Sequence, residues 1–184
     1  ADLDTARRYP ALLRESFGTR ARAVLRRYPL SRYHHDAEIA WSAVFTDRIW
    51  ACGQVATADE LARFTPVYTY EFADEHGQPL ATLPPGFPAG ASHGSELMDL
   101  FDVAGRRPIT SGYYTPAQRR LARDLITYWT TFARAGHPSG AGLPAWPVSR
   151  PGHAERPALR LAPGPGGIRP ADAAARHQCA FWLR

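Results

Sequence analysis

The sequence contains no lysine and no asparagine, so all 22 of its basic residues are arginines. Both missing residue types have A/T-rich codons, and a G/C-rich genome explains their absence without any binding partner. The arginines are scattered and mixed with acids, as in the segment 119–124. A nucleic-acid surface would instead concentrate basic residues and interleave exposed aromatic rings. Despite the net charge of +5, we therefore expect no nucleic-acid partner.

Long apolar runs are also missing. No stretch of eighteen apolar residues exists, so we expect no membrane-spanning helix and no membrane partner. The first ten residues, ADLDTARRYP, lack the apolar core of a signal peptide. Hydrophobic residues make up 45% of the chain and charged residues 21%, which is typical of a globular protein. At 184 residues, the chain is long enough for one domain of ordinary size.

Cysteine is scarce, and the two cysteines, Cys52 and Cys179, lie far apart in the sequence. They cannot form a structural zinc site alone, because such a site needs four nitrogen or sulfur ligands at short spacings. Two buried thiols are the simplest interpretation of the residues. The histidines form no metal-binding pattern either, and we expect no metal, no cofactor and mostly solvated side chains at His34, His35, His76, His153 and His177.

The hydrophobic pattern predicts more helix than strand. The best-defined helix covers 115–135, with Thr115 as its cap, Pro116 in the first position and Gln118 completing a capping box. Leu121, Leu125, Trp129 and Phe132 then form a stripe for packing, and Gly136 ends the helix. We expect Trp146 and Trp182 in the core. The other expected helices are 5–17, starting near Pro10 and stopping at Gly18; 21–28; 34–64, introduced by Ser31 and divided by Gly53 and the polar segment 57–60; and 170–182.

Two strands are expected, over 66–72 and 158–161. In the first, PVYTYEF, alternation places Tyr68, Tyr70 and Phe72 on one face. A long Pro/Gly-rich loop, 75–94, follows it. Two strands do not make an independently stable sheet. The chain is therefore expected to be part of a fold.

The loop contains Gly90-Ala91-Ser92-His93-Gly94, which satisfies the nucleophile-elbow pattern G-x-S-x-G. That pattern requires an apolar strand immediately before the serine, so that the hydroxyl stands at the strand end. Here LPPGFPA precedes Ser92, and three prolines exclude such a strand. We interpret Ser92 as a loop residue and keep a small self-sufficient esterase using Ser92 as a lesser alternative.

The neighbouring residues carry a resemblance. Gly90 to Leu97, GASHGSEL, followed by Phe101, resembles the catalytic-histidine loop of type-B carboxylesterases, which include cholinesterases and bacterial para-nitrobenzyl esterases. PVYTYEF stands where that family has a strand rich in Tyr and Phe. Four further stretches match the family in the same order: TDRIWAC (46–52), YWTTFARAGHPSG (128–140), LPAWP (143–147) and QCAFW (178–182). His137 departs from the pattern, since an acidic residue is commoner there.

The resemblance implies the C-terminal part of an α/β-hydrolase fold, mostly helices with few strands of its own, and residues 1–184 would form one incomplete domain. It assigns His93 as the histidine of a Ser-acid-His triad that hydrolyses a small-molecule ester. Glu96 would be a partly buried carboxylate that steadies the loop, since it lies too close along the chain to orient His93 as a second acid. Gly90 and Gly94 would be structural neighbours of the site. Phe87 and Leu97 are candidates for the substrate pocket from proximity alone.

The family's serine, oxyanion hole and triad acid belong upstream of this chain. Asp2 and Asp4 are the nearest carboxylates, but neither lies in the family's acid motif. We therefore expect the isolated chain to be nearly inactive and an upstream half of the same hydrolase to be its partner. A non-catalytic structural or interaction segment derived from the same family is the alternative.

The resemblance also bears on the cysteines, because the matching positions in cholinesterases are joined. It implies a Cys52–Cys179 disulfide, with two free thiols as the alternative. A disulfide would favour an extracytoplasmic or secreted location, and free thiols a cytoplasmic one.

Overall fold

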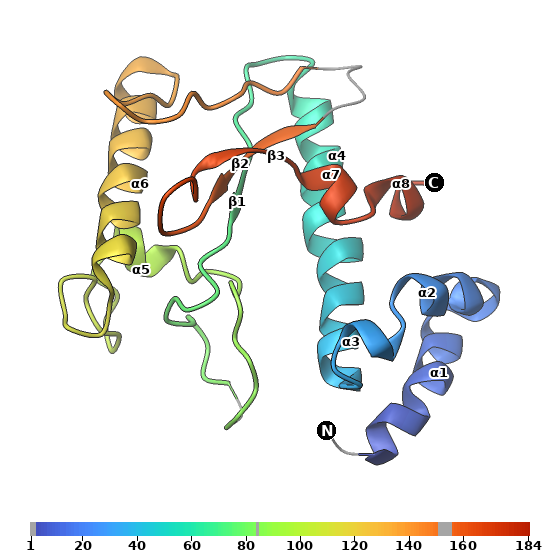
Figure 1. Ribbon diagram of the computed structural model, residues 1–184. Helices are drawn as coiled ribbons and strands as arrows, with labels where there is room; N and C mark the ends of the chain where they lie inside the picture. The colour runs from blue at the N-terminus through green and yellow to red at the C-terminus, as the bar shows by residue number, and fades with distance from the viewer. Residues whose placement is uncertain (1–2, 84, 151–155) are drawn as a thin grey trace. The chain divides into compact units, whose positions relative to one another are not determined.

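The computed structural model describes the backbone of residues 3–83, 85–150 and 156–184 (Figure 1). The chain divides into two compact units. The first unit comprises Ala1–Thr57 and Ala174–Arg184, and the second comprises Ala58–Ala173. Each unit has its own hydrophobic cluster. None of the helices in the described part is long and apolar enough to cross a membrane.

The first unit is helical. Gly18, with φ of +52°, follows the end of the first helix, where a positive φ favours glycine. The second helix ends just before Tyr28 and Pro29, as predicted. The helices of this unit are α1 (Leu3–Phe17), the 3₁₀ turn η1 (Gly18–Arg20), α2 (Ala21–Arg27), η2 (Leu30–Arg32), α3 (Ala37–Phe45), the π-helix η3 (Thr46–Ala51), the start of α4 (Cys52–Leu61), most of α7 (Ala173–Arg176) and α8 (Cys179–Trp182).

Three predicted details of this unit are wrong. Helix α1 begins at Leu3, and Pro10 lies inside it, where its missing N–H removes one backbone bond without ending the helix. Asp36, not Ser31, caps α3, because its carboxylate accepts the backbone N–H groups of Glu38 and Ile39. The long helical region is divided by η3 and not at Gly53, which lies within α4.

The core of the first unit gathers side chains from α1, α2, α3 and the C-terminal residues. Cys52 and Cys179 form a disulfide in this core, with their Cα atoms 5.2 Å apart. The pairing implied by the resemblance is confirmed, and the alternative of two free thiols is wrong. The fully or nearly buried members are Tyr9, Leu13, Ala21, Val24, Tyr28, Ala37, Ala40, Val44, Cys52, Val55, Cys179 and Trp182.

The second unit contains a three-stranded sheet in the order β1-β2-β3. Strand β1 (Tyr70–Phe72) pairs in parallel with β2 (Pro157–Leu161), with Tyr70 opposite Leu159. Strand β3 (Arg169–Asp172) pairs antiparallel with β2, with Leu159 opposite Pro170. The predicted strand 66–72 is thus shorter than expected, since Val67 forms only an isolated bridge with Ser149.

The third strand was not predicted, and the expected helix 170–182 is wrong at its start. Pro170 lies in β3, and the helical remainder is split into α7 and α8. The split falls at Gln178, whose φ of +55° is incompatible with a continuous right-handed helix.

Helix α6 (Pro116–Ala135) covers the sheet (Figure 1). Both halves of the predicted capping box form between Thr115 and Gln118, and Gly136 ends the helix with φ of +75°. Leu121, Leu125 and Tyr128 are buried against Leu159 and Leu161 of β2. Phe132 is 48% exposed, so the predicted stripe is buried only over its first part.

The predicted face of the first strand is confirmed by its aromatic contacts. Tyr68 lies edge-on to Phe132, with ring centroids 6.0 Å apart, and Tyr70 lies edge-on to Trp129, at 5.1 Å. Phe72 packs on the same cluster of α6 and β2. Trp146 also packs in this cluster, and Trp182 is buried in that of the first unit, as predicted. The chain is mostly helical with a small sheet, as expected for the C-terminal part of an α/β-hydrolase fold.

Candidate functional site

His93 lies exposed in a turn of the long loop between β1 and the short helix α5 (Leu97–Leu100). The carbonyl oxygen of Ser92 accepts two hydrogen bonds from Ser95, one from its backbone N–H at 3.1 Å and one from its hydroxyl at 2.7 Å. These two hydrogen bonds link Ser92 and Ser95, which lie on either side of His93 in the chain. The backbone that carries the imidazole is therefore held by local contacts.

Two features favour glycine at position 94. Its φ is +77°, a conformation that L side chains rarely adopt. A Cβ atom at Gly94 would also lie 2.7 Å from Cδ2 of Leu80, within the same loop. Gly90 has a φ of +56° but open space around it, so only its backbone conformation favours glycine. The turn at Gly94 packs directly on the part of the loop that leaves β1.

Glu96 lies near the sheet as well as the His93 turn. Its carboxylate is half-buried, and its charge acts on the Tyr70 hydroxyl of β1. Burial, followed by the nearby Glu96 charge, raises the pKa of Tyr70, so this hydroxyl keeps its proton. The residue three positions after His93 thus lies close to a strand. The steadying role predicted for Glu96 stays a prediction.

Two further acids lie near Glu96 and are almost completely buried. Asp74 follows β1 and is 1% exposed, and Asp99 in α5 is 3% exposed. Asp74 accepts hydrogen bonds from the Gln118 amide at 2.8 Å and from the His76 backbone at 3.0 Å. Burial, then the charges of Asp74 and Glu96, raise the pKa of Asp99 to about 7.

No pattern in the sequence indicated that Asp74 and Asp99 lie together. Asp74 and Asp99 belong to different elements, and the loop between them hides their proximity. The available signal was an aspartate at position 99 within an otherwise apolar segment, LMDLF. A charged residue inside such a segment indicates either exposure or a special environment.

Ser92 lies in irregular structure, and the part of the loop that the structure describes contains no strand between Phe72 and Ser92. Its Oγ atom is buried and has no hydrogen-bond partner among the described residues. A nucleophile elbow needs a strand immediately before the serine. The geometry therefore does not support Ser92 as a nucleophile.

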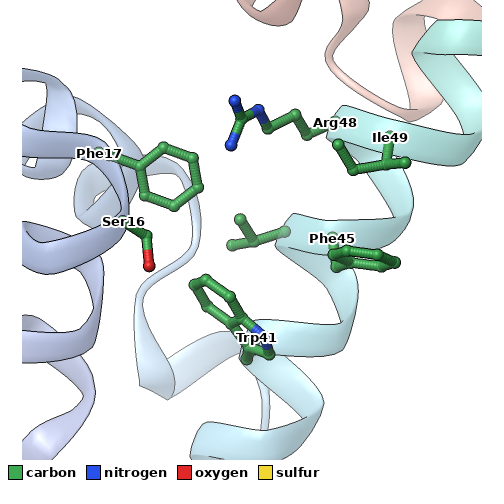
Figure 2. A pocket seen from close by; sticks show the side chains of 7 residues that line it. Ser16, Phe17, Trp41, Phe45, Arg48 and Ile49 are labelled. Atoms are coloured by element: carbon green, nitrogen blue, oxygen red, sulfur yellow. The ribbon is translucent and has the colours of Figure 1, made fainter.

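The candidate pocket residues lie on either side of His93. Phe87 belongs to the same loop, Leu97 begins α5, and both are half-buried. Two cavities, with volumes of about 210 and 350 Å³, lie in the first unit and not beside these residues. Figure 2 shows the smaller one, between the end of α1 and the α3–η3 segment, with Phe17 facing Trp41. The substrate-pocket role of Phe87 and Leu97 stays a prediction.

The other histidines have varied surroundings. His34 and His35 are exposed, with φ of +53° and +60°. His177 is not solvated as expected, because its Nδ1 lies 2.7 Å from an Asp47 carboxylate oxygen. His153 and the side chains of Asp2 and Asp4 lie outside the described residues. Within the described part, no group of three or more His, Cys, Asp or Glu residues is arranged to hold a metal ion.

Comparison with known proteins identifies the family. Residues 8–182 match the model of the carboxylesterase family. The chain is 34% identical to carboxylesterase 4A of Bos taurus over 113 residues. This match covers 61% of this chain and 18% of that protein. It is 38% identical over 86 residues to human cocaine esterase, covering 45% of this chain and 14% of that protein.

Mouse neuroligin-3 is also similar, with 35% identity over 100 residues, covering 53% of this chain and 12% of that protein. The chain thus spans less than a fifth of the length of these relatives. The family match extends over nearly the whole sequence and includes the His93 loop and both cysteines. This chain therefore belongs to the carboxylesterase family.

Proposed function

We propose that this chain is the histidine-bearing segment of a serine carboxylesterase, with His93 as the general base and acid. The observation that carries the proposal is an exposed imidazole on a turn with fixed local contacts. Ser95 closes the turn, Gly94 packs on Leu80, and Glu96 lies near Tyr70 of β1. A side chain that transfers protons must be both accessible and held in position.

The proposed chemistry is acyl transfer in two steps. Neutral His93 accepts the hydroxyl proton of a serine as the serine oxygen bonds to the ester carbonyl carbon. The resulting imidazolium then donates that proton to the leaving alcohol as the carbon–oxygen bond breaks. Water repeats the sequence on the acyl-enzyme, which releases the carboxylic acid and the free serine. Histidine suits both transfers because its ordinary pKa is close to neutral pH.

The serine, the oxyanion hole and the triad acid belong, in this proposal, to an upstream segment of the same hydrolase. Strand β1 supports this, because β2 is its only ladder partner in the described part of the chain, so its other edge is open. Parallel strands are normally buried on both sides and at their edges by further structure. Residues 1–184 would then be one incomplete domain, completed by the upstream segment.

The proposed substrate is a small-molecule ester, and neither nucleic acid nor a membrane is part of the proposal. The disulfide between Cys52 and Cys179 fits an extracytoplasmic location, since disulfides persist in oxidising compartments.

The test is hydrolysis of p-nitrophenyl butyrate by the chain joined to its upstream segment and by the chain alone. We expect hydrolysis only from the joined protein, with a loss of at least about 10³-fold in His93→Gln, the order seen when a triad member is removed. His137→Gln is the matched control, because His137 is also exposed on a loop and has no assigned role.

Two other outcomes favour the alternatives. A folded joined protein without turnover would indicate a non-catalytic structural or interaction segment. Hydrolysis by the isolated chain that disappears in Ser92→Ala would indicate a self-sufficient esterase and contradict the proposal.

A further inference from the structure

Three acids from two parts of the chain meet beside the His93 turn. Asp74 follows β1, whereas Glu96 and Asp99 lie at the start of and within α5. Asp74 and Asp99 are both buried, and both Asp74 and Glu96 act electrostatically on Asp99. The three groups therefore repel one another whenever all of them are ionised.

The three acids differ in their hydrogen-bond partners. Asp74 accepts hydrogen bonds from the Gln118 amide and the His76 backbone, and Glu96 lies near the Tyr70 hydroxyl. In contrast, Oδ2 of Asp99 has no hydrogen-bond partner in the part of the chain that the structure describes. Ionised Asp99 would thus be an uncompensated charge, which a buried site strongly disfavours.

A second unsatisfied polar atom lies in the same place. Tyr114, just before α6, is 2% exposed, and its hydroxyl has no hydrogen-bond acceptor among the described residues. The charges of Asp99 and Asp74 both act on this hydroxyl. The nearby guanidinium of Arg119 donates to the Tyr114 carbonyl oxygen and so points to backbone, not to Asp99. Among the described residues, the groups that interact electrostatically with Asp99 include two acids, Asp74 and Glu96, and the neutral phenol of Tyr114.

Backbone hydrogen bonds connect Asp99 to His93. The Asp99 N–H donates to the Glu96 carbonyl at 3.0 Å, and the Leu97 N–H donates to the Gly94 carbonyl at 3.1 Å. Ser95 then binds Ser92 on the other side of the imidazole. A movement of Asp99 toward water would therefore displace the whole turn.

We propose that Asp99 is a positioning residue for His93: its neutral carboxyl lets α5 lie against Asp74, and its ionisation displaces the turn that presents the imidazole. Burial beside Asp74 and Glu96 raises the pKa of Asp99 to about 7, which places the change near neutral pH. The consequence for hydrolysis rests on the proposed function of His93.

The test compares the wild-type joined protein with Asp99→Asn and Asp99→Ser, which keep a short polar group without its ionisation. Asp102→Asn is the control, since Asp102 is an exposed acid on the same segment. We expect the wild-type rate of p-nitrophenyl butyrate hydrolysis to fall above pH 7, by up to about tenfold per pH unit for a single ionisation. Both Asp99 variants should keep their rate there, with an unchanged acid limb.

Hydrogen exchange of the 94–100 amides gives a readout that does not need turnover. We expect their protection, corrected for intrinsic exchange, to fall between pH 6 and pH 9 in the wild type and in Asp102→Asn but not in the Asp99 variants. Equal protection profiles in all proteins would overturn the role of Asp99, whatever the activity. Loss of protection without any hydrolysis would support the coupling and overturn the proposed function alone.

Discussion

The carboxylate of Asp47 connects segments of the first unit by hydrogen bonds, so its removal should lower the stability of that unit. Asp47 lies in η3 and is 8% exposed. One oxygen accepts a hydrogen bond from the Tyr28 hydroxyl at 2.7 Å, and the other lies 2.7 Å from Nδ1 of His177. The Trp182 indole N–H donates in turn to the Tyr28 oxygen at 2.8 Å. Asp47 thus joins η3 to the end of α2 and to the segment before Cys179.

Replacing Asp47 with alanine leaves the Tyr28 hydroxyl buried without its acceptor and the His177 ring without its partner. Burial raises the pKa of Tyr28, so this hydroxyl stays protonated and cannot avoid the loss by ionising. Breaking a buried pair in this way costs about 3–5 kcal/mol, and the partial exposure of His177 favours the lower end. For a chain of this length, about 3 kcal/mol corresponds to a Tm decrease of about 6–12 °C.

The assay is urea denaturation of the oxidised chain, followed by tryptophan fluorescence and by far-ultraviolet circular dichroism. Asp47→Asn keeps one acceptor oxygen. It should lower the free energy of unfolding by about half as much as Asp47→Ala, since a hydrogen bond to a charged group is worth about 1.5–3 kcal/mol. Glu38→Gln, on the exposed face of α3, is the control and should stay within about 0.5 kcal/mol. A similarly small effect for Asp47→Ala would show that its hydrogen bonds do not stabilise the first unit.

Three further predictions concern the disulfide, the second core and Asp99. Replacing both Cys52 and Cys179 with alanine should lower the free energy of unfolding by about 4–5 kcal/mol, as the chain-entropy model gives for the 127-residue separation, measured in urea. Leu125→Ala, at 0% exposure, should lower it by about 2–5 kcal/mol in the same assay, whereas an effect below 1 kcal/mol would contradict the packing described. The folded-state pKa of Asp99 is about 7, which exceeds the ordinary value of 3.8. The free energy of unfolding of the wild type, relative to that of Asp99→Asn, should therefore fall by up to about 4 kcal/mol as the pH rises from about 4 to about 7. It should not fall further above that pH. Parallel stability curves for the two proteins over this range would contradict the burial of a carboxyl there.

The elements predicted correctly from the sequence are those whose stabilising contacts lie within one continuous segment. Helix α6 was found because Thr115 and Gln118 form its cap and Gly136 its end within one continuous segment. Strand β2 was found from its apolar residues. The disulfide was predicted through a family resemblance and not from spacing, since two distant cysteines carry no pairing information by themselves.

The elements that were missed depend on contacts across the chain. Strand β3 has the sequence RPAD, which has little intrinsic preference for a strand and becomes one by pairing with β2. The π-helix η3 contains no glycine or proline to mark it, and its Asp47 is held by Tyr28 and His177. The grouping of Asp74 with Asp99 likewise arises only when α5 folds back beside the end of β1.

In the proposed mechanism, His93 activates a serine located in another segment of the protein. The most direct measurement is the rate at which a fluorophosphonate probe labels the joined protein, with the modified residue identified by mass spectrometry. We predict one labelled serine outside residues 1–184, with labelling slowed at least about 10³-fold in His93→Ala and unchanged in His137→Ala. Labelling of Ser92, or equal labelling rates in His93→Ala and the wild type, would contradict this account.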